Sequence, residues 1–217
     1  LAYSKSKIDE IFFENYKDLH YLKKTNFHET KLKKAIIIGN GISINKNLVK
    51  VKNLLKRKNH LNIFLNKNKY INNKSYSNYT VVVNTLRLLS DLNQYANTSI
   101  SLIAPIKKFK KLFNLKFKNK KIINYPVCIK AKTFNVNKKY TIIPYDLALN
   151  YALSVCKILN IKEIYFIGID GYDDAEKNLE LINSIDLFKK SNKDIKIFSY
   201  TDFVYKSKIL EKLSFPT

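Results

Sequence analysis

The stretch PYDLALNYALSVCKILNIKEIYFIGIDGY, residues 144–172, indicates the fold class because it joins a buried helix to a buried strand. Apolar residues recur at helical spacing after Pro144, and Asp146 stands where it would cap the helix. The predicted buried face consists of Ala148, Tyr151, Ala152, Val155 and Leu159. Residues 164–169 form a continuous apolar run of strand length, which is typical of a parallel strand covered on both faces.

The rest of the chain repeats this alternation of strand and helix. The predicted strands are residues 35–38, 61–65, 80–83, 99–104, 121–127 and 195–198. The predicted helices are residues 45–58, 85–95, 105–115 and 173–191, and residues 67–79, 130–139 and 199–217 are predicted to be irregular. The alternation predicts an α/β fold, a Rossmann-like three-layer domain with a mostly parallel sheet over residues 31–217.

The N-terminal residues predict a separate arm. Within residues 1–24, apolar residues recur at helical spacing and predict an amphipathic helix. These residues are Ile8, Ile11, Phe12, Tyr16, Leu19 and Leu22. Residues 1–30 are therefore interpreted as a helical arm that packs on the domain or joins it to another one. The chain begins with Leu1 and contains no methionine, so we expect it to be the C-terminal part of a longer protein.

The net charge of +23 comes almost entirely from lysines, which alternate with Asn, Ile, Tyr and Phe, the residues that AT-rich coding favours. Arg57 and Arg87 are the only arginines, and direct reading of bases relies on arginine forks. Nucleic acid is therefore disfavoured as a partner. A basic surface attracts phosphates in general, which leaves a nucleotide-linked substrate and an anionic membrane surface open.

Cysteine use and hydropathy indicate a cytoplasmic protein. No apolar run approaches the about 18 residues that span a membrane, and residues 1–24 lack a signal-peptide pattern. Cys128 and Cys156 are interpreted as small core residues in a reducing setting, with contact to the inner face of the membrane left open. His20, His28 and His60 show no metal-ligand spacing, so neither a metal site nor a cofactor is predicted.

The sequence GNGIS, residues 39–43, directly follows the first predicted strand and precedes a predicted helix. A strand, a glycine turn and a helix together can hold a phosphate on backbone N–H groups. The full dinucleotide fingerprint needs a third glycine where Ile44 stands, which disfavours a nicotinamide or flavin site. The alternative is a tight turn between strand and helix, for which two glycines suffice.

Polar side chains stand where the predicted strands end. Asn40, Asn66 and Asn84 each follow a strand, and Asp170 ends the strand of residues 164–169. An asparagine both donates and accepts hydrogen bonds, which suits ribose hydroxyls and a pyrimidine edge. Each one alone is more typical of a turn or a helix cap, but their joint occurrence at strand ends favours ligand binding.

The loop Asp170-Gly171-Tyr172 adds a phenol to this edge of the sheet. Tyr172 could donate a hydrogen bond to a leaving phosphate, and the alternative is an aromatic residue that holds the loop in place. The predicted nucleotide-binding residues are Gly39, Asn40, Gly41, Ser43, Asn66, Asn84, Asp170 and Gly171, with Tyr172 as the catalytic candidate.

Four stretches make the chain similar to the C-terminal domain behind HMGL-type (TIM-barrel) aldolase domains in proteins of bacterial surface-polysaccharide loci. That family has a G-x-G turn, a helix of the LALAYALAVA type, an AGFDGY strand end and an S-x-T-P-T-x-Y segment. The matching stretches are residues 38–43, 147–159, 167–172 and 199–205, although Asp202 and Phe203 replace Pro-Thr in the last. The resemblance implies an upstream aldolase-like domain joined through the N-terminal helix.

More distantly, the chain resembles the Cst-type bacterial sialyltransferases, which use a CMP-activated donor. The resemblance lies in residues 38–43, in Asn66 and Asn84, and in residues 162–172. It implies that the glycine turn, the strand-end asparagines and Asp170 hold the nucleotide, and that Tyr172 helps the phosphate to leave. The chain departs from that family because no histidine follows His60, and the family's catalytic histidine therefore has no counterpart.

Other departures concern the phosphate contacts. The second phosphate tyrosine of the Cst-type family has no counterpart in residues 173–178, and its arginine and Ser/Thr before the central helix fall on Tyr145, Leu147 and Ala148. We therefore expect a domain that binds a nucleotide or nucleotide-sugar, CMP-linked by preference, with glycosyl transfer as its activity if it is an enzyme. The alternative is a non-catalytic appendage that positions an upstream aldolase domain or docks partners. A third hypothesis is attachment to a polyanion or membrane surface through lysines.

Overall fold

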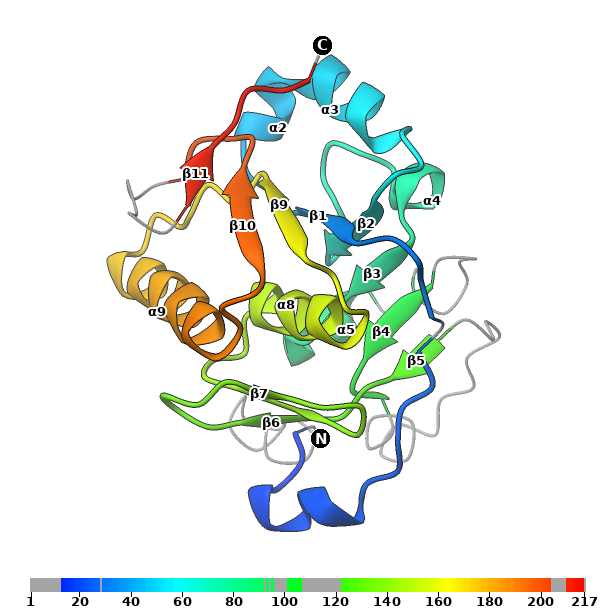
Figure 1. The fold of residues 1–217 in the computed structure, drawn as a ribbon, viewed down its shortest axis with the longest axis vertical. Coiled ribbons are helices and arrows are strands. Elements are labelled where there is room, and N and C mark those ends of the chain that lie inside the picture. The colour runs from blue at the N-terminus through cyan, green and yellow to red at the C-terminus, as the bar shows by residue number, and fades with distance from the viewer. Residues whose placement is uncertain are drawn as a thin grey trace.

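The fold is α/β with a mostly parallel sheet, as the sequence predicts. The computed structural model describes residues 13–27, 29–91, 93, 95, 101–106, 122–203 and 210–216. Within them, an eight-stranded parallel sheet has the order β11-β10-β9-β1-β2-β3-β4-β5 (Figure 1). Its strands are β1 Lys34–Ile38, β2 Leu61–Leu65, β3 Tyr79–Val81, β4 Leu102–Ala104, β5 Ile122–Asn124, β9 Glu163–Ile167, β10 Lys196–Ser199 and β11 Glu211–Lys212.

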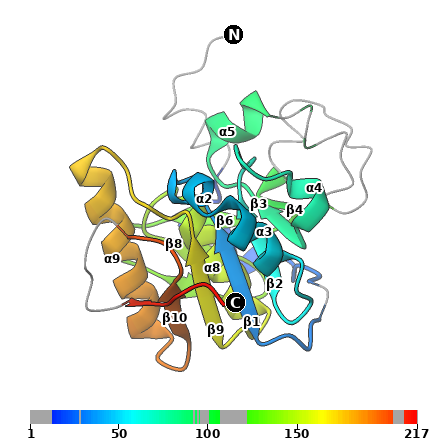
Figure 2. The same cartoon turned by 90° about the horizontal axis from the view of Figure 1, so that it is seen from above.

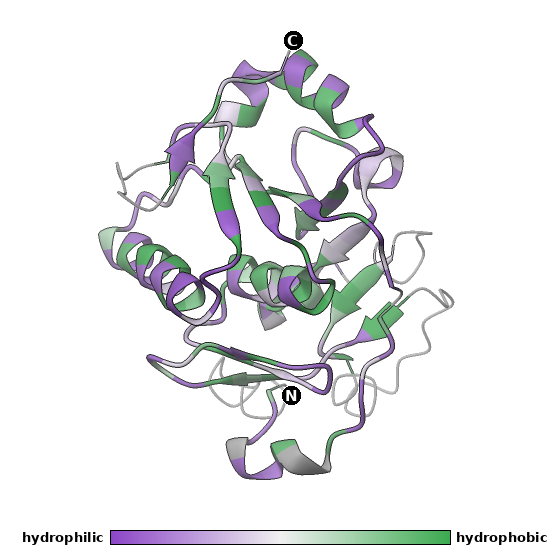
Figure 3. Ribbon diagram, viewed as in Figure 1, coloured by the Kyte–Doolittle hydropathy of each residue, from purple (hydrophilic) through white to green (hydrophobic). Residues whose placement is uncertain are grey.

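Helices cover both faces of the sheet and make three layers. The helices described are η1 Tyr16–Tyr21, α2 Ser43–Lys46, α3 Leu48–Leu55, α4 Asn73–Tyr76, α5 Thr85–Ser90, α8 Ala148–Ile158 and α9 Ala175–Ser191. Along β1, Ala35 and Ile37 pack into the core shared with α8 and α9, whereas Ile36 and Ile38 pack against α2 and α3. Figure 2 shows β1 beside β9 from above, and Figure 3 shows hydrophilic and hydrophobic residues alternating along α9.

The central helix α8 is buried along most of its length, from Leu149 to Cys156. Its polar residue Ser154 is fully buried and hydrogen-bonds to the hydroxyl of Thr141 (2.7 Å) and to the carbonyl of Asn150 (3.0 Å), which removes the cost of burying it. The prediction of a cap by Asp146 is wrong: the helix begins two residues later, its N-cap is Leu147, and no side chain caps it.

A small second sheet packs on α8 and was not predicted. It consists of β6 Val127–Ile129, β7 Asn135–Val136 and β8 Thr141–Ile143 in the order β6-β8-β7. The predicted strand of residues 121–127 is divided between β5 and β6, because the chain leaves the large sheet at Tyr125 and Pro126. The buried Tyr125 hydroxyl donates to the carbonyls of Asn137 and Tyr140, both at 2.9 Å, and so fixes the second sheet.

The N-terminal segment differs from the predicted amphipathic helix. Residues 1–12 lie outside the described residues, η1 is a short 3-10 helix capped by Asn15, and residues 22–27 are not helical. Leu19 is buried against Cys128 and Ile142 of the second sheet. The N–H of Thr25 donates to the carbonyl of Lys138 (2.6 Å), and this contact to the second sheet takes the place of a helical hydrogen bond.

Other predicted elements have different bounds. The helix of residues 45–58 is divided into α2 and α3 at Asn47, whose side chain donates to the Ser43 carbonyl at 3.0 Å. The predicted loop 67–79 contains α4, the tail 199–217 contains β11, and α5 ends at Ser90. The helix of residues 105–115 lies outside the described residues beyond Ile106.

Cys128 and Cys156 are both buried and neither forms a disulfide, as predicted, and burial raises the pKa of the Cys156 thiol. Among the described residues, no helix has the length and apolarity that crossing a membrane requires.

Candidate functional site

The strand order reverses between β1 and β9, and the loops that follow these two strands meet there. From β1 the chain moves through β2, β3, β4 and β5 in one direction, whereas β9, β10 and β11 extend in the other. The N–H of Gly39 donates to the Ile167 carbonyl and the N–H of Gly41 donates to the Gly168 carbonyl, both at 2.9 Å. In open parallel sheets, ligands bind at this reversal, beyond the carboxyl ends of the strands.

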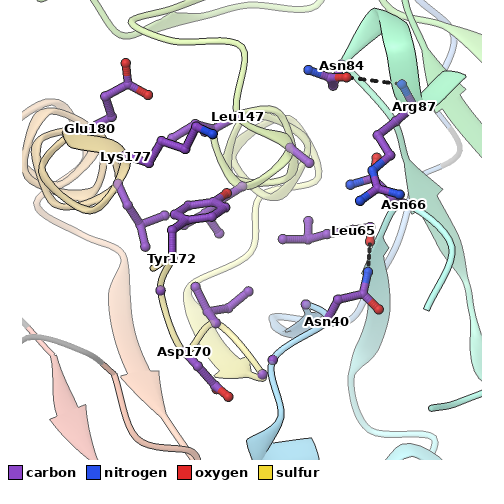
Figure 4. A pocket seen from close by; sticks show the side chains of 18 of the residues that line it. Asn40, Leu65, Asn66, Asn84, Arg87, Leu147, Asp170, Tyr172, Lys177 and Glu180 are labelled. Atoms are coloured by element: carbon purple, nitrogen blue, oxygen red, sulfur yellow. Dashed lines mark hydrogen bonds between the residues drawn. The ribbon is translucent and has the colours of Figure 1, made fainter. Parts of the chain in front are cut away.

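A pocket of about 510 Å³ opens at this point (Figure 4). Its floor is formed by the ends of β1, β2 and β9, and its walls by the first turns of α5, α8 and α9. Every predicted site residue except Ser43 lines it, namely Gly39, Asn40, Gly41, Asn66, Asn84, Asp170, Gly171 and Tyr172. Residues that follow strands far apart in the sequence are therefore brought together as expected.

Ser43 and Asp170 bind each other rather than facing the pocket together. Asp170 Oδ2 accepts from the N–H of Ser43 at 2.8 Å, and its Oδ1 accepts from the Ser43 hydroxyl. Figure 4 shows the Asp170 side chain directed away from Tyr172 and the middle of the pocket. Because an internal carboxylate already occupies the GNGIS turn, we expect the phosphate of a ligand to lie elsewhere in the pocket.

Replacing Asp170 with alanine is expected to lower the free energy of unfolding by about 2 kcal/mol, because the Ser43 N–H and hydroxyl lose a charged partner. Urea denaturation measures the loss. Asp173→Ala is the matched control, since Asp173 is exposed in the same loop. Equal stability of the two variants would contradict a role of Asp170 in holding the turn.

Two of the strand-end asparagines hold the backbone in place. Asn40 donates from Nδ2 to the Lys67 carbonyl at 3.0 Å and accepts from the Lys69 N–H at 2.8 Å, and so ties the first turn to the segment after β2. Asn84 accepts from the N–H of Arg87 at 3.1 Å and caps α5. Both residues therefore make the hydrogen bonds expected of a turn former or a helix cap, which is the alternative to ligand binding.

Asn66 differs from these two residues. Its backbone is in the left-handed region, with φ of 59°, and its Oδ1 is buried without a hydrogen-bond partner in the described part of the chain. A buried amide oxygen without a donor is costly, so a group at a pocket wall in this state favours a ligand or water that supplies the donor. Among the predicted asparagines, Asn66 has the clearest unused capacity for a ligand.

Tyr172 is 44% exposed, and its backbone is fixed to α9. Its N–H donates to Asn178 Oδ1 at 2.7 Å, and Asn178 Nδ2 donates back to the Tyr172 carbonyl at 2.6 Å. Burial, followed by the charges of Glu180 and Asp146, raises the pKa of the Tyr172 phenol. The phenol therefore stays protonated at neutral pH and can act as a hydrogen-bond donor.

Four charged residues that were not predicted for the site also line the pocket. They are Arg87 on α5, Asp146 before α8, and Lys177 and Glu180 on α9. Asn84 Nδ2 donates to Asp146 Oδ2 at 3.1 Å, so the residue expected to cap α8 instead faces α5. One signal in the sequence was available: Lys177 and Glu180 are three residues apart on the helix after Tyr172, and so share a face.

The pKa of Glu180 is raised by its partial burial, then by the negative charges of Asp146, Glu176 and Asp174, while Lys177 opposes the rise. Perturbed carboxyl groups of this kind are common in functional sites. Glu180 is therefore a candidate site residue by its position in the pocket lining, and its raised pKa agrees with that position.

Histidine is not part of the described pocket lining. His60 immediately precedes β2, at the opposite end of the strand from the pocket, and burial followed by the charge of Arg57 lowers its pKa. His28 and the side chain of His20 lie outside what the structure describes. Over the described residues, no group of three His, Cys, Asp or Glu side chains is placed to hold a metal ion.

Comparisons with protein-family models, with curated proteins and with solved structures found no match to this chain.

Proposed function

We propose that the pocket binds a nucleotide or nucleotide-sugar, CMP-linked by preference, and that the protein transfers the sugar to a hydroxyl acceptor. The observation that carries this proposal is the convergence of Asn66, Arg87 and Tyr172 on one pocket at the reversal of the strand order. These residues supply an amide for a nucleoside, a guanidinium for a phosphate and a phenol for the leaving oxygen.

The charges of the pocket support a ligand with two chemical halves. Arg87 and Lys177 line it together with Asp146 and Glu180, whereas the Asp170 carboxylate is bound to Ser43, so acidic groups balance basic ones within a chain of net charge +23. A guanidinium binds phosphate oxygens in a bidentate manner, and carboxylates accept hydrogen bonds from hydroxyls. An anionic phosphate attached to a sugar rich in hydroxyls provides partners for both the guanidinium and the carboxylates.

Arg87 is the favoured phosphate ligand. No ion pair or hydrogen bond joins its guanidinium to another described residue, whereas Lys177 lies 3.9 Å from the carboxylate of Asp174. In Figure 4 the Arg87 side chain descends from α5 toward Asn66. Both groups therefore belong to the same wall of the pocket.

In this proposal, Tyr172 assists the departure of the phosphate. Its phenol remains protonated, and Asn178 holds its backbone in position through both the N–H and the carbonyl of Tyr172. A hydrogen bond from the phenol stabilises the negative charge that develops on the phosphate oxygen as the glycosidic bond breaks. The resemblance to the Cst-type sialyltransferases at residues 162–172 supports the same role and the preference for CMP.

CMP at about 100 times its Kd should stabilise the protein by roughly 2.7 kcal/mol, and Arg87→Gln should weaken this binding about 10- to 100-fold. Thermal-shift and calorimetric titrations with CMP, UMP, CDP and UDP measure both effects. Arg57→Gln is the matched control, because Arg57 follows α3 and does not line the pocket. Absence of binding by all four nucleotides to the folded protein would overturn the proposal.

A second proposal is a non-catalytic appendage that positions an upstream aldolase-like domain or docks a partner. The observation that favours it is that Asn40, Asn84 and Asp170 all form hydrogen bonds within the protein. Residues that act only as caps and ties need no ligand. The same nucleotide titrations separate the two proposals, since an appendage of this kind would bind none of the four.

A further inference from the structure

We propose that Glu180 is the general base of this pocket, which accepts the proton of the attacking hydroxyl; the inference rests on the proposed glycosyl transfer. A base must lie within hydrogen-bond reach of the hydroxyl that it activates. The pocket lining supplies no histidine among the described residues, so its carboxylates are the candidate proton acceptors.

Hydrogen bonding distinguishes the three carboxylates that line the pocket. Asp170 accepts from both the N–H and the hydroxyl of Ser43, and its side chain is directed away from Tyr172. Asp146 accepts from Asn84 at 3.1 Å, which holds it against the start of α5. The carboxylate of Glu180 forms no hydrogen bond or ion pair with any residue that the structure describes, and it is free to accept a proton.

The position of Glu180 relative to Tyr172 is fixed by α9. Asn178 binds the N–H and the carbonyl of Tyr172, and Glu180 follows two residues later on the same helix. Figure 4 shows Glu180 and Lys177 extending from α9 on the side of the pocket where Tyr172 lies. A donor whose phosphate meets Tyr172 would thus have its sugar close to Glu180.

The charges around Glu180 make it a better base. Asp146 before α8 and Tyr172 in the loop after β9 interact electrostatically with Glu180, and Arg87 on α5 lines the same pocket. On its own helix Glu180 faces Lys177, Glu176 and Asp174. Partial burial and then Asp146 raise the pKa of Glu180 above its usual value, which strengthens proton acceptance.

The proposed step is balanced. The acceptor oxygen, in a hydroxyl or in water, forms a bond to the anomeric carbon, and its proton passes to the Glu180 carboxylate. The bond from the anomeric carbon to the phosphate oxygen breaks, and its electron pair leaves on the nucleotide phosphate beside Tyr172. Glu180 later returns the proton to solvent, so the reaction needs no oxidant or reductant.

Release of nucleotide with water as acceptor tests the inference without knowledge of the natural acceptor. The probes are CMP-sialic acid and a panel of UDP-sugars, and CMP binding is measured beside them. Glu180→Gln should lower kcat about 100-fold or more and leave the Kd for CMP within about twofold. Glu211→Gln is the matched control, because Glu211 is an exposed acid on β11 that does not line the pocket.

The pH profile separates a base from a residue that only supports the structure. The wild-type rate should rise with pH as Glu180 loses its proton and then level off, since the base acts when deprotonated. Glu180→Gln should abolish this rise of the rate with pH, the acidic limb of the profile. Glu180→Asp should restore part of the rate, with the rise moved to a different pH. Thermal denaturation of each variant verifies that it is folded.

Each outcome decides one question. If the wild type binds CMP and releases nucleotide while Glu180→Gln keeps both the rate and the acidic limb, the role of Glu180 is overturned and the proposed function stands. If the wild type binds CMP but releases nucleotide from no donor, the base role is overturned and only binding remains. If no nucleotide binds, the proposed function falls, and the role of Glu180 falls with it.

Discussion

Gly39→Ala is expected to lower the free energy of unfolding by about 3 kcal/mol or more. A Cβ at this position would lie closer than 3.0 Å to the carbonyl oxygen of Gly168 and to the side chain of Ile169. The oxygen is backbone, in a residue with φ of +66°, so it cannot rotate away. Urea denaturation of the variant measures the loss.

Gly41→Ala provides the comparison. The Cβ there would meet the carboxylate of Asp170, which is a side chain and can move at the expense of its bonds to Ser43. The loss should therefore be smaller, and much of it should disappear when Asp170 is already alanine. If Gly39→Ala were as stable as the wild type, this would contradict the close approach of the loops that follow β1 and β9.

Tyr125→Ala is expected to destabilise the protein by about 3–5 kcal/mol, as is usual for removing a buried aromatic ring. The ring is fully buried, stacks on Tyr151 at 5.6 Å between centroids, and meets the edge of Phe27 at 5.2 Å. The N-terminal segment, the second sheet and α8 all meet at this side chain. Denaturant titration measures the difference.

Tyr125→Phe separates the ring from its hydroxyl. It keeps the packing but leaves the carbonyls of Asn137 and Tyr140 without this donor, and we expect a loss of about 1–3 kcal/mol. Because Tyr125 does not line the pocket, CMP binding by the folded variant should be unchanged. Equal losses in both variants would mean that the ring itself contributes nothing, contrary to its burial.

The large sheet could be predicted from the sequence because its strands are covered on both faces. Residues 164–169 are apolar without interruption, and α8 is preceded by Pro144, so neither segment had a plausible alternative. The second sheet lacked such a signal, since β7 has only the two residues Asn135 and Val136. The N-terminal residues showed helical spacing, but contacts such as that of Thr25 with Lys138 hold residues 22–27 outside a helix.

For the site, the sequence could predict positions but not partners. Strand ends place Asn40, Asn66 and Asp170 at one edge of a parallel sheet, and this follows from topology alone. That Asp170 binds Ser43 depends on how two loops 127 residues apart cross, which no local pattern contains. The roles of Arg87 and Glu180 depend on which helix face turns toward the pocket, and only the packing of α5 and α9 decides that.

Asp170 also forms a wall between two hollows. A second hollow of about 540 Å³ is lined by Ser43, Asp170, Tyr200, Phe215 and neighbouring residues. Anything bound there that drew the Asp170 carboxylate away from Ser43 would shift the loop that carries Tyr172. Thermodynamic linkage then requires reciprocity: each occupant would change the affinity for the other by the same factor. Through the shared Asp170 side chain, occupancy of one hollow would then change the binding affinity of the other.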